Sequence, residues 1–212
     1  MCSHYESVRD ANRLFQYFGV EQPLDIRFDV WPAYNSTFII KPDEADVEDE
    51  AVPAWIALSG QFGLLPHWAK EKTYGRRTFN ARSETVAEKP SFKDAWRAGH
   101  RCIIPAEVIY EPDWRSGKAV QTRIARKDGE PMGIAGLWST WGQGSQKIDS
   151  FTMLTINADD HALMNQFHKS GEEKRMVVIL PKASYKDWLS VPVHEAKAFL
   201  RQYPADRLGI SA

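Results

Sequence analysis

The sequence predicts an α+β fold, with a single β-rich domain of mostly antiparallel strands and peripheral helices. Three observations favour this class. Short β-prone segments, bounded by glycine, proline or aspartate, recur along the chain and dominate its second half. Helical spacing of apolar residues is confined to a few short segments set around these strands. No repeat, low-complexity linker or shift in composition divides the 212 residues, so we expect one domain over 1–212.

In the first half of the chain, apolar residues recur at three- and four-residue steps over 7–18, which predicts a helix. Ser7 is its expected N-cap, and Gly19 is expected to end it. A proline before and a glycine after the segment 91–98 predict a second, short helix. Short β-rich runs predict strands at 28–31, 37–40 and 54–58.

In the second half, strands outnumber helices. Apolar and β-branched runs, punctuated by glycine or aspartate, predict strands at 102–104, 107–110, 120–126, 133–138, 150–156 and 176–180. Helical spacing and flanking loop residues predict three helices, at 159–167, 183–189 and 194–203. This order of elements is typical of an α+β protein rather than of a regular alternation of strand and helix.

The charge of the chain is unevenly distributed. The net charge is −1, but six acids lie in the run 43–50, so the rest of the chain carries +5. The window 70–82 holds one acid, Glu71, and five cations: Lys70, Lys72, Arg76, Arg77 and Arg82. Such a local excess favours contact with a phosphate backbone, and a solvated surface is the alternative for each charged run.

Several classes of protein are not expected. No apolar run approaches the 18 or more residues of a transmembrane helix, and the first residues lack a signal-peptide pattern. Two cysteines, one of them at position two, do not build a disulfide framework, so we expect a cytoplasmic protein. His161 and His168 are seven residues apart, which is no recognised metal-ligand spacing. We expect no membrane segment, no metal and no cofactor.

Cys2 is the first candidate for chemistry. A small residue after the initiator permits removal of Met1, which leaves a free α-amine and a thiol on adjacent carbons. With an aldehyde these two nucleophiles close a five-membered thiazolidine, and with an acyl group they support amide cleavage. Reference pKa values of about 8 for the amine and about 8.5 for the thiol leave usable fractions of both bases at neutral pH. A chance cysteine on a frayed terminus is the alternative.

The motif 79–85 follows the basic window and is polar at alternate positions. Asn80 is able to donate and to accept hydrogen bonds, which suits it to hold an α-amine. Arg82 is suited to clamp a phosphate bidentately. Taken alone, the motif favours the alternative, a loop with a surface arginine.

Glu111 ends an apolar strand and has aromatic neighbours. Partial desolvation there raises a carboxyl pKa toward the range useful for proton transfer, and a strand-end glutamate facing solvent is the alternative. Among the six histidines, His168 follows a predicted helix in a polar loop that is able to present an imidazole to a cleft. Cys102 lies in an apolar strand, so we expect an inert core thiol.

Several motifs in order along the chain resemble the SOS response-associated peptidase (SRAP) family. They are Met1-Cys2, FGLLPHWAK (62–70), FNARSET (79–85), RCIIPAEVIYEPDW (101–114), GIAGLW (133–138) and FHKSGEEKRMVVIL (167–180). The resemblance runs from residue 1 to about residue 189. Several motifs in register are far more specific than any one of them.

The resemblance implies a β-rich α+β domain that recognises abasic sites in single-stranded DNA. It implies that the chain removes its own Met1 and that the freed Cys2 forms a thiazolidine with the ring-opened aldehyde of the sugar. The family's amine-positioning asparagine falls on Asn80, its proton-shuttling glutamate on Glu111, and its histidine, which protonates the sugar ring oxygen, on His168. No obligate protein partner is implied.

The same resemblance implies residues that bind the DNA. The family's phosphate-contacting arginine falls on Arg82, and an aromatic of its DNA-binding wedge falls on Trp68. Lys70 and Arg77 join them as DNA-binding candidates because both lie in the basic window.

Three departures from the family pattern stand out. Ser3 and His4 follow Cys2 where the family usually has Gly-Arg, so a DNA-facing arginine is missing. Pro112-Asp113 separates Glu111 from a tryptophan that often follows the family's glutamate directly. The loop between His168 and the next arginine is longer than the common short version.

Two other functions remain open on the sequence. One is a cysteine peptidase that acts on other proteins, with Cys2 and His168 as nucleophile and base. The other is a non-catalytic single-stranded DNA-binding module, in which Trp68 stacks on a base and Arg82 holds a phosphate. Turnover of peptides would identify the first, and reversible binding that never becomes covalent would identify the second.

Overall fold

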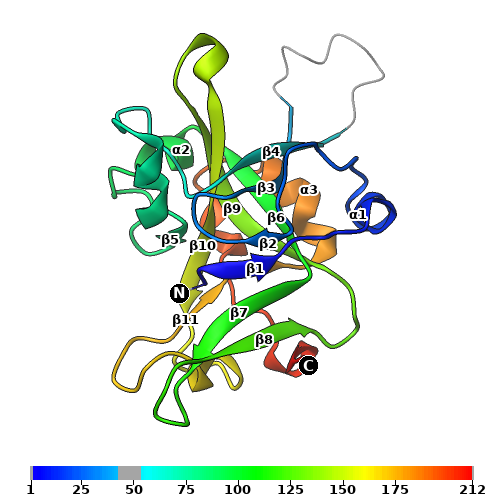
Figure 1. Cartoon of the computed structure of the whole chain (residues 1–212), viewed down its shortest axis with the longest axis vertical. Helices are drawn as coiled ribbons and strands as arrows, with labels where there is room; N and C mark the ends of the chain where they lie inside the picture. The colour runs from blue at the N-terminus through cyan, green and yellow to red at the C-terminus, as the bar shows by residue number, and fades with distance from the viewer. Residues whose placement is uncertain (1, 43–53, 212) are drawn as a thin grey trace.

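A computed structural model describes residues 2–42 and 54–211 (Figure 1). Met1 and the acidic run 43–50 lie outside the described residues. Two β-sheets make up most of the described chain, and short helices lie around them. The expected β-rich α+β class with mostly antiparallel strands is confirmed. In the described residues, only β4–β10 and β5–β10 pair in parallel.

The smaller sheet holds the N-terminal segment. Its strand order is β13-β8-β7-β1-β2. Each of its pairings is antiparallel among the residues described. The strands are β1 (His4–Glu6), β2 (Asp29–Val30), β7 (Val108–Asp113), β8 (Val120–Arg126) and β13 (Leu208–Ile210).

The larger sheet curls into a closed, barrel-like ring. Its strands are β3 (Asn35–Ile40), β4 (Ile56–Phe62), β5 (Asn80–Arg82), β6 (Arg101–Ala106), β9 (Met132–Trp141), β10 (Ile148–Asn157), β11 (Arg175–Val177) and β12 (Ile179–Leu180). The order β11-β10-β4-β3-β6-β9-β12 closes because β9 also pairs with β10. β5 adds to β10 outside this ring.

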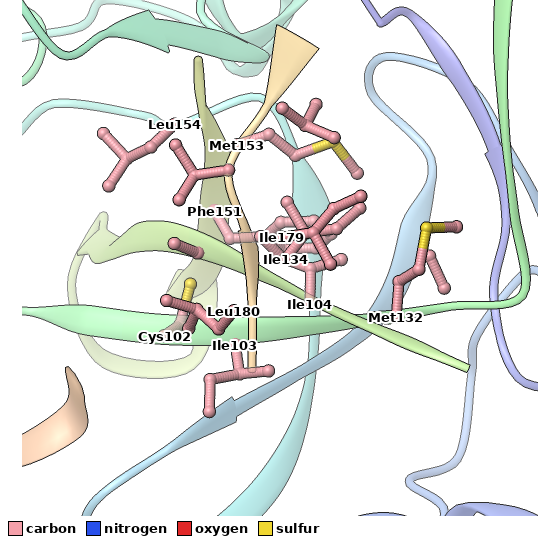
Figure 2. Packing of buried hydrophobic residues seen from close by; sticks show 14 of the residues in the cluster. Cys102, Ile103, Ile104, Met132, Ile134, Phe151, Met153, Leu154, Ile179 and Leu180 are labelled. Carbon is pink, nitrogen blue, oxygen red and sulfur yellow. The ribbon is translucent and has the colours of Figure 1, made fainter. Parts of the chain in front are cut away.

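The core is one continuous apolar cluster that draws on both sheets. Figure 2 shows part of it, where Ile104, Ile134 and Phe151 meet. Cys102 is fully buried in this cluster, and burial raises the pKa of its thiol well above its usual value. The expectation of a core thiol at this position is confirmed.

The first helix, α1 (Ala11–Phe18), begins later than expected. Asp10 caps it, because its carboxylate accepts the N–H groups of Asn12 and Arg13 at 2.8 and 3.2 Å. The prediction that Ser7 is the cap was wrong. The N–H of Ser7 donates to the carbonyl of Phe28, which extends the pairing of β1 beyond the strand and delays the helix. Gly19 ends the helix at φ 72° as expected.

Two further predicted helices were wrong in type. The segment 159–167 forms only a 3-10 turn at Met164–Gln166. There the His161 ring accepts the N–H groups of Leu163 and Met164, which takes them out of a continuous helical ladder. The segment 194–203 forms a 3-10 turn at Ala196–Phe199 that buries only one side chain, which is too little to hold a longer helix. The other predicted helices correspond to α2 (Lys93–Arg97) and α3 (Tyr185–Ser190).

The predicted strand at 176–180 is two strands that pair with different neighbours. β11 pairs with β10, and β12 pairs with β9. Between them, Val178 donates to Leu154 and accepts from Ala135, so the chain crosses from one neighbour to the other without losing a hydrogen bond.

Gly136 lies at the close approach of β9 and its neighbours. A Cβ there would lie 2.5 Å from the backbone oxygen of Thr152 and 2.8 Å from the sulfur of Cys102. We expect Gly136→Ala to lower the free energy of unfolding by about 1–3 kcal/mol, because the backbone of β10 must shift to make room. Urea denaturation measures this. Gly209→Ala is the control, since its Cβ would meet only the flexible side chain of Lys127; equal losses in both variants would contradict the account.

Candidate active site

The N-terminal residues are held inside the smaller sheet. β1 lies between β2 and β7, with Tyr5 opposite Val30 and His4 opposite Tyr110. Figure 1 shows β1 between β2 and β7. Cys2 lies two residues before the start of β1 and is 1% exposed. The thiol therefore lies in a fixed, buried position and not on a frayed end.

Asn80 holds the backbone of Cys2. Its Nδ2 donates to the carbonyl oxygen of Cys2 at 2.8 Å. The sequence predicts that Asn80 holds the amine, which stays a prediction; the bond in this structure is made with the carbonyl oxygen. The Oδ1 of Asn80 is buried and has no hydrogen-bond partner among the described residues. A buried acceptor next to Cys2 is suited to take an N–H of a freed α-amine.

Glu111 is a buried carboxyl in β7, with no exposed surface. Burial raises its pKa to about 7. The charged form of Glu111 also raises the pKa of the Cys2 thiol, although burial of the thiol is the larger cause. The pair therefore combines a carboxyl that titrates near neutrality with a thiol that stays protonated.

His168 approaches Glu111 from the loop after the 3-10 turn. Its Nε2 lies 3.2 Å from Oε2 of Glu111 and 3.2 Å from the carbonyl oxygen of Arg175. The N–H of His168 donates to the carbonyl of Pro112 in β7, the residue is left-handed at φ 63°, and it is buried. Burial lowers the pKa of His168 to about 4, so the ring is neutral at neutral pH.

The structure brings four of the predicted site residues together. Asn80 contacts Cys2, and His168 contacts Glu111, whose charge acts on the Cys2 thiol. They come from four separate parts of the chain: the N-terminus, β5, β7 and the loop before β11.

The DNA-binding candidates differ in their surroundings. Arg82 lies on β5 two residues beyond Asn80, and its side chain is half exposed. Trp68 is 42% exposed and packs edge-on against Tyr74, with ring centroids 5.1 Å apart. Lys70 and Arg77 are exposed in the segment between β4 and β5. All four DNA-binding candidates are therefore at least partly exposed to solvent, and they lie on β5 or on the segment that precedes it.

Sequence reasoning missed Arg175, which is buried at the start of β11. Its guanidinium donates to both carboxylate oxygens of Glu84, at 3.0 and 2.9 Å, and to the carbonyl of Thr155 at 2.8 Å. Its own carbonyl is the oxygen near His168. The available signal was its place directly before the apolar run 176–180, where a buried arginine needs a paired acid.

Sequence reasoning also missed the role of His4 in fixing β1. Its ring stacks between Trp31 and Tyr110, with both pairs of ring centroids 4.0 Å apart. One ring nitrogen pairs with Asp29, and the other accepts the side-chain amide of Gln121 at 2.6 Å. Where the family usually has an arginine, this chain therefore has a buried ring that ties β1 to β2, β7 and β8.

Over 2–42 and 54–211, no group of three or more His, Cys, Asp or Glu side chains is arranged to hold a metal ion. No helix within those ranges has the length and apolar character needed to span a membrane.

The chain matches the family model described as SOS response associated peptidase (SRAP) over residues 1–212. It is 33% identical to the abasic site processing protein YoqW of Bacillus subtilis, over 97% of this chain and 89% of that protein. It is 36% identical to YobE of the same organism, also named an abasic site processing protein, over 90% of this chain and 82% of that protein. It is 26% identical to the abasic site processing protein HMCES of Gallus gallus, over 72% of this chain and 51% of that protein.

Solved structures share the fold. A protein from Bordetella bronchiseptica superposes with a TM-score of 0.89 at 45% identity, and the match covers 99% of this chain and 98% of the other. A protein from Bacteroides thetaiotaomicron superposes with a TM-score of 0.79 at 20% identity, over 99% of this chain and 90% of the other. The second likeness concerns the fold alone.

Proposed function

The chain belongs to the SOS response-associated peptidase (SRAP) family, and on this basis we propose that it captures abasic sites in single-stranded DNA covalently through Cys2. The names of the relatives support an abasic site as the target. The observation that carries the proposal is the surroundings of Cys2. Near Cys2 lie the carboxyl of Glu111, with a pKa of about 7, and the buried Oδ1 of Asn80, which has no hydrogen-bond partner among the described residues.

The reaction begins with the amine of Cys2. Hydrolysis of the peptide bond after Met1 consumes one water and frees this amine. The amine nitrogen then attacks the aldehyde carbon of the ring-opened sugar, and the resulting hydroxyl leaves as water to give an imine. The sulfur of Cys2 adds to the same carbon, and the thiol proton passes to the nitrogen. The product is a thiazolidine, and the condensation releases one water.

Glu111 is the proton carrier in this proposal. Its pKa of about 7 means that both of its forms are populated at neutral pH. The carboxylate form takes a proton from the attacking amine, and the acid form delivers one to the departing hydroxyl. The same group serves the removal of Met1, where a proton must reach the leaving amine.

His168 acts beside Glu111 as a neutral hydrogen-bond donor. The sequence predicts that His168 itself protonates the sugar ring oxygen, but a pKa of about 4 leaves little imidazolium at neutral pH. Its Nε2 lies 3.2 Å from the carboxyl of Glu111. We therefore assign the proton to Glu111 and the orientation of that carboxyl to His168.

The state of the thiol argues against a peptidase that acts on other proteins. A cysteine nucleophile in such an enzyme is activated as a thiolate, with a lowered pKa. Burial raises the pKa of Cys2 instead. This supports an order in which the amine attacks first and the thiol follows.

Denaturing electrophoresis of the protein mixed with abasic single-stranded DNA tests the proposal. We expect a shifted, heat-stable band with the abasic strand. A borohydride-reduced abasic strand has no aldehyde and is the control that must give no such band. Reversible binding without a covalent band on any abasic strand would instead support a non-catalytic DNA-binding module.

The proposal predicts a salt-dependent contact at Arg82. We expect Arg82→Ala to weaken binding to single-stranded DNA across sequences and to flatten the plot of log affinity against log salt. The change in slope should be about 0.7, the value for one phosphate contact on a single strand. Fluorescence anisotropy with an unmodified strand measures both quantities. Arg115→Ala is a matched control, since Arg115 is paired to Asp113 on β7. An unchanged slope in Arg82→Ala would mean that Arg82 makes no contact with the DNA phosphates.

A further inference from the structure

The half-exposed Arg82 already holds an anion that belongs to the chain. Its Nη1 lies 2.7 Å from a carboxylate oxygen of Glu173, in the loop between His168 and β11. The other oxygen of Glu173 accepts a hydrogen bond from Arg175 at 2.7 Å. One carboxylate therefore bridges two guanidinium groups, as a phosphate does when it contacts two arginines.

Arg82 and Asn80 lie on the same face of β5. Side chains two residues apart on a strand point to the same side. Asn80 holds Cys2 by its carbonyl, so Arg82 is directed toward the side of β5 on which Cys2 lies. A strand of DNA whose sugar reaches Cys2 brings its phosphates to this side. Glu173 thus occupies the position that the backbone of such a strand would need.

Of the two arginines that Glu173 bridges, Arg175 is buried and Arg82 is exposed. Arg175 is 2% exposed, and its bonds to Glu84 and Thr155 do not involve Glu173. The side chains of Arg82 and Glu173 are 49% and 35% exposed. Exposed ion pairs are weak, so a phosphate is able to replace the carboxylate on Arg82 while the bonds of Arg175 to Glu84 and Thr155 remain.

We propose that Glu173 takes the place of a DNA phosphate on Arg82, and that single-stranded DNA must displace it to bind. The inference rests on the proposed function, because it requires DNA to reach Arg82. Glu173 then sets the affinity: a strand gains a contact at Arg82 only by breaking the contact already there. Since the hydrogen bond from Arg175 lowers the pKa of Glu173, the competitor is charged at neutral pH.

The loop supplies a matched control. Glu172 carries the same charge one residue earlier and is exposed. Its N–H donates to Lys169, and its side chain has no hydrogen bond or ion pair to Arg82 among the described contacts. Removing either charge makes the loop less repulsive to DNA, but only removal of Glu173 frees Arg82.

The experiment measures reversible binding of a fluorescent, unmodified single strand to the full chain by anisotropy, at about 50 mM and about 200 mM salt. We expect Glu173→Gln to bind about two- to fivefold more tightly than the wild type at the lower salt. The gain should shrink at the higher salt, because both ion pairs are screened. Glu172→Gln should give less than half of that gain. In an Arg82→Gln background, Glu173→Gln should gain no more affinity than Glu172→Gln does, because only the general loss of repulsion remains.

Two results would overturn the inference. One is an equal gain in Glu172→Gln and Glu173→Gln, which would mean a general charge effect. The other is a full gain from Glu173→Gln in the Arg82→Gln background. A wild type that binds no single strand and forms no crosslink would instead count against the proposed function. Matching thermal melting of the variants and the wild type guards against a folding artefact.

Discussion

Replacing Cys2 by alanine is expected to abolish the heat-stable crosslink to abasic single-stranded DNA, while a reversible adduct persists. The alanine variant keeps the α-amine, so it still forms an imine with the aldehyde. It lacks the sulfur that closes the ring, so the imine remains open to hydrolysis. Borohydride should therefore capture the adduct, and heating without borohydride should release it. Denaturing electrophoresis with and without the reductant measures both outcomes.

The serine variant and a second cysteine sharpen this test. We expect Cys2→Ser to resemble Cys2→Ala, because a hydroxyl is a far weaker nucleophile than a thiol. Cys102→Ala removes the other thiol, which is fully buried in the core, and should crosslink like the wild type. A heat-stable crosslink from Cys2→Ala at the wild-type rate would mean that a lysine amine is the nucleophile and that no thiazolidine forms.

Glu111→Gln is expected to slow crosslinking about 10²–10⁴-fold, the usual range for loss of a positioned acid or base. The amide keeps the shape of the carboxyl but carries no proton near neutral pH. The final adduct should be the same heat-stable species, reached more slowly. The variant must have a free Cys2, exposed by cleavage of a fused leader, because a failure to remove Met1 would otherwise imitate a chemical defect.

The same substitution is expected to stabilise the fold at neutral pH. The pKa of Glu111 is raised to about 7 in the folded protein and is near 4.5 in the unfolded chain. Between pH 4.5 and pH 7 the Glu111 carboxyl is ionised in the unfolded chain but stays protonated in the folded protein. The stability contributed by the neutral carboxyl is therefore fully present below pH 4.5 and is lost as the pH rises to 7. At pH 8, Glu111→Gln should therefore be more stable than the wild type by roughly 3 kcal/mol.

Urea denaturation at pH 4.5 and pH 8 measures this difference, which should vanish at the lower pH. Glu107→Gln is the control, since Glu107 is partly exposed and paired with Arg13. It should neither slow crosslinking nor stabilise the protein at pH 8. A Glu111→Gln variant that crosslinks at the wild-type rate would mean that Glu111 transfers no proton in the reaction.

The sequence predicted the strands of the larger sheet better than the elements next to Cys2. β9 and β10 are recognisable in the sequence as long apolar runs, because their side chains are buried along most of their length. β1 and β5 have three residues each, too few for any periodicity to show. They are strands because β7 and β10, distant in sequence, offer backbone partners to them.

The candidate site was predicted one residue at a time. Local pattern and family resemblance pointed to Cys2, Asn80, Glu111 and His168, but neither gives distances. The contact between His168 and Glu111 depends on a bridge between Asp113 and Phe167, which brings the loop onto β7. The pairing of Arg82 with Glu173 could not be predicted either, because Glu173 lies 91 residues away in the chain and has no sequence feature that distinguishes it from other exposed acids.

Mass spectrometry of the crosslinked protein tests the central claim most directly. The wild type would be reacted with a short abasic strand, digested with protease and nuclease, and its N-terminal peptide fragmented. The account predicts a peptide that begins at Cys2, lacks Met1, and carries the sugar remnant on Cys2 with the loss of one water. A remnant on a lysine, or on a peptide that still carries Met1, would contradict it.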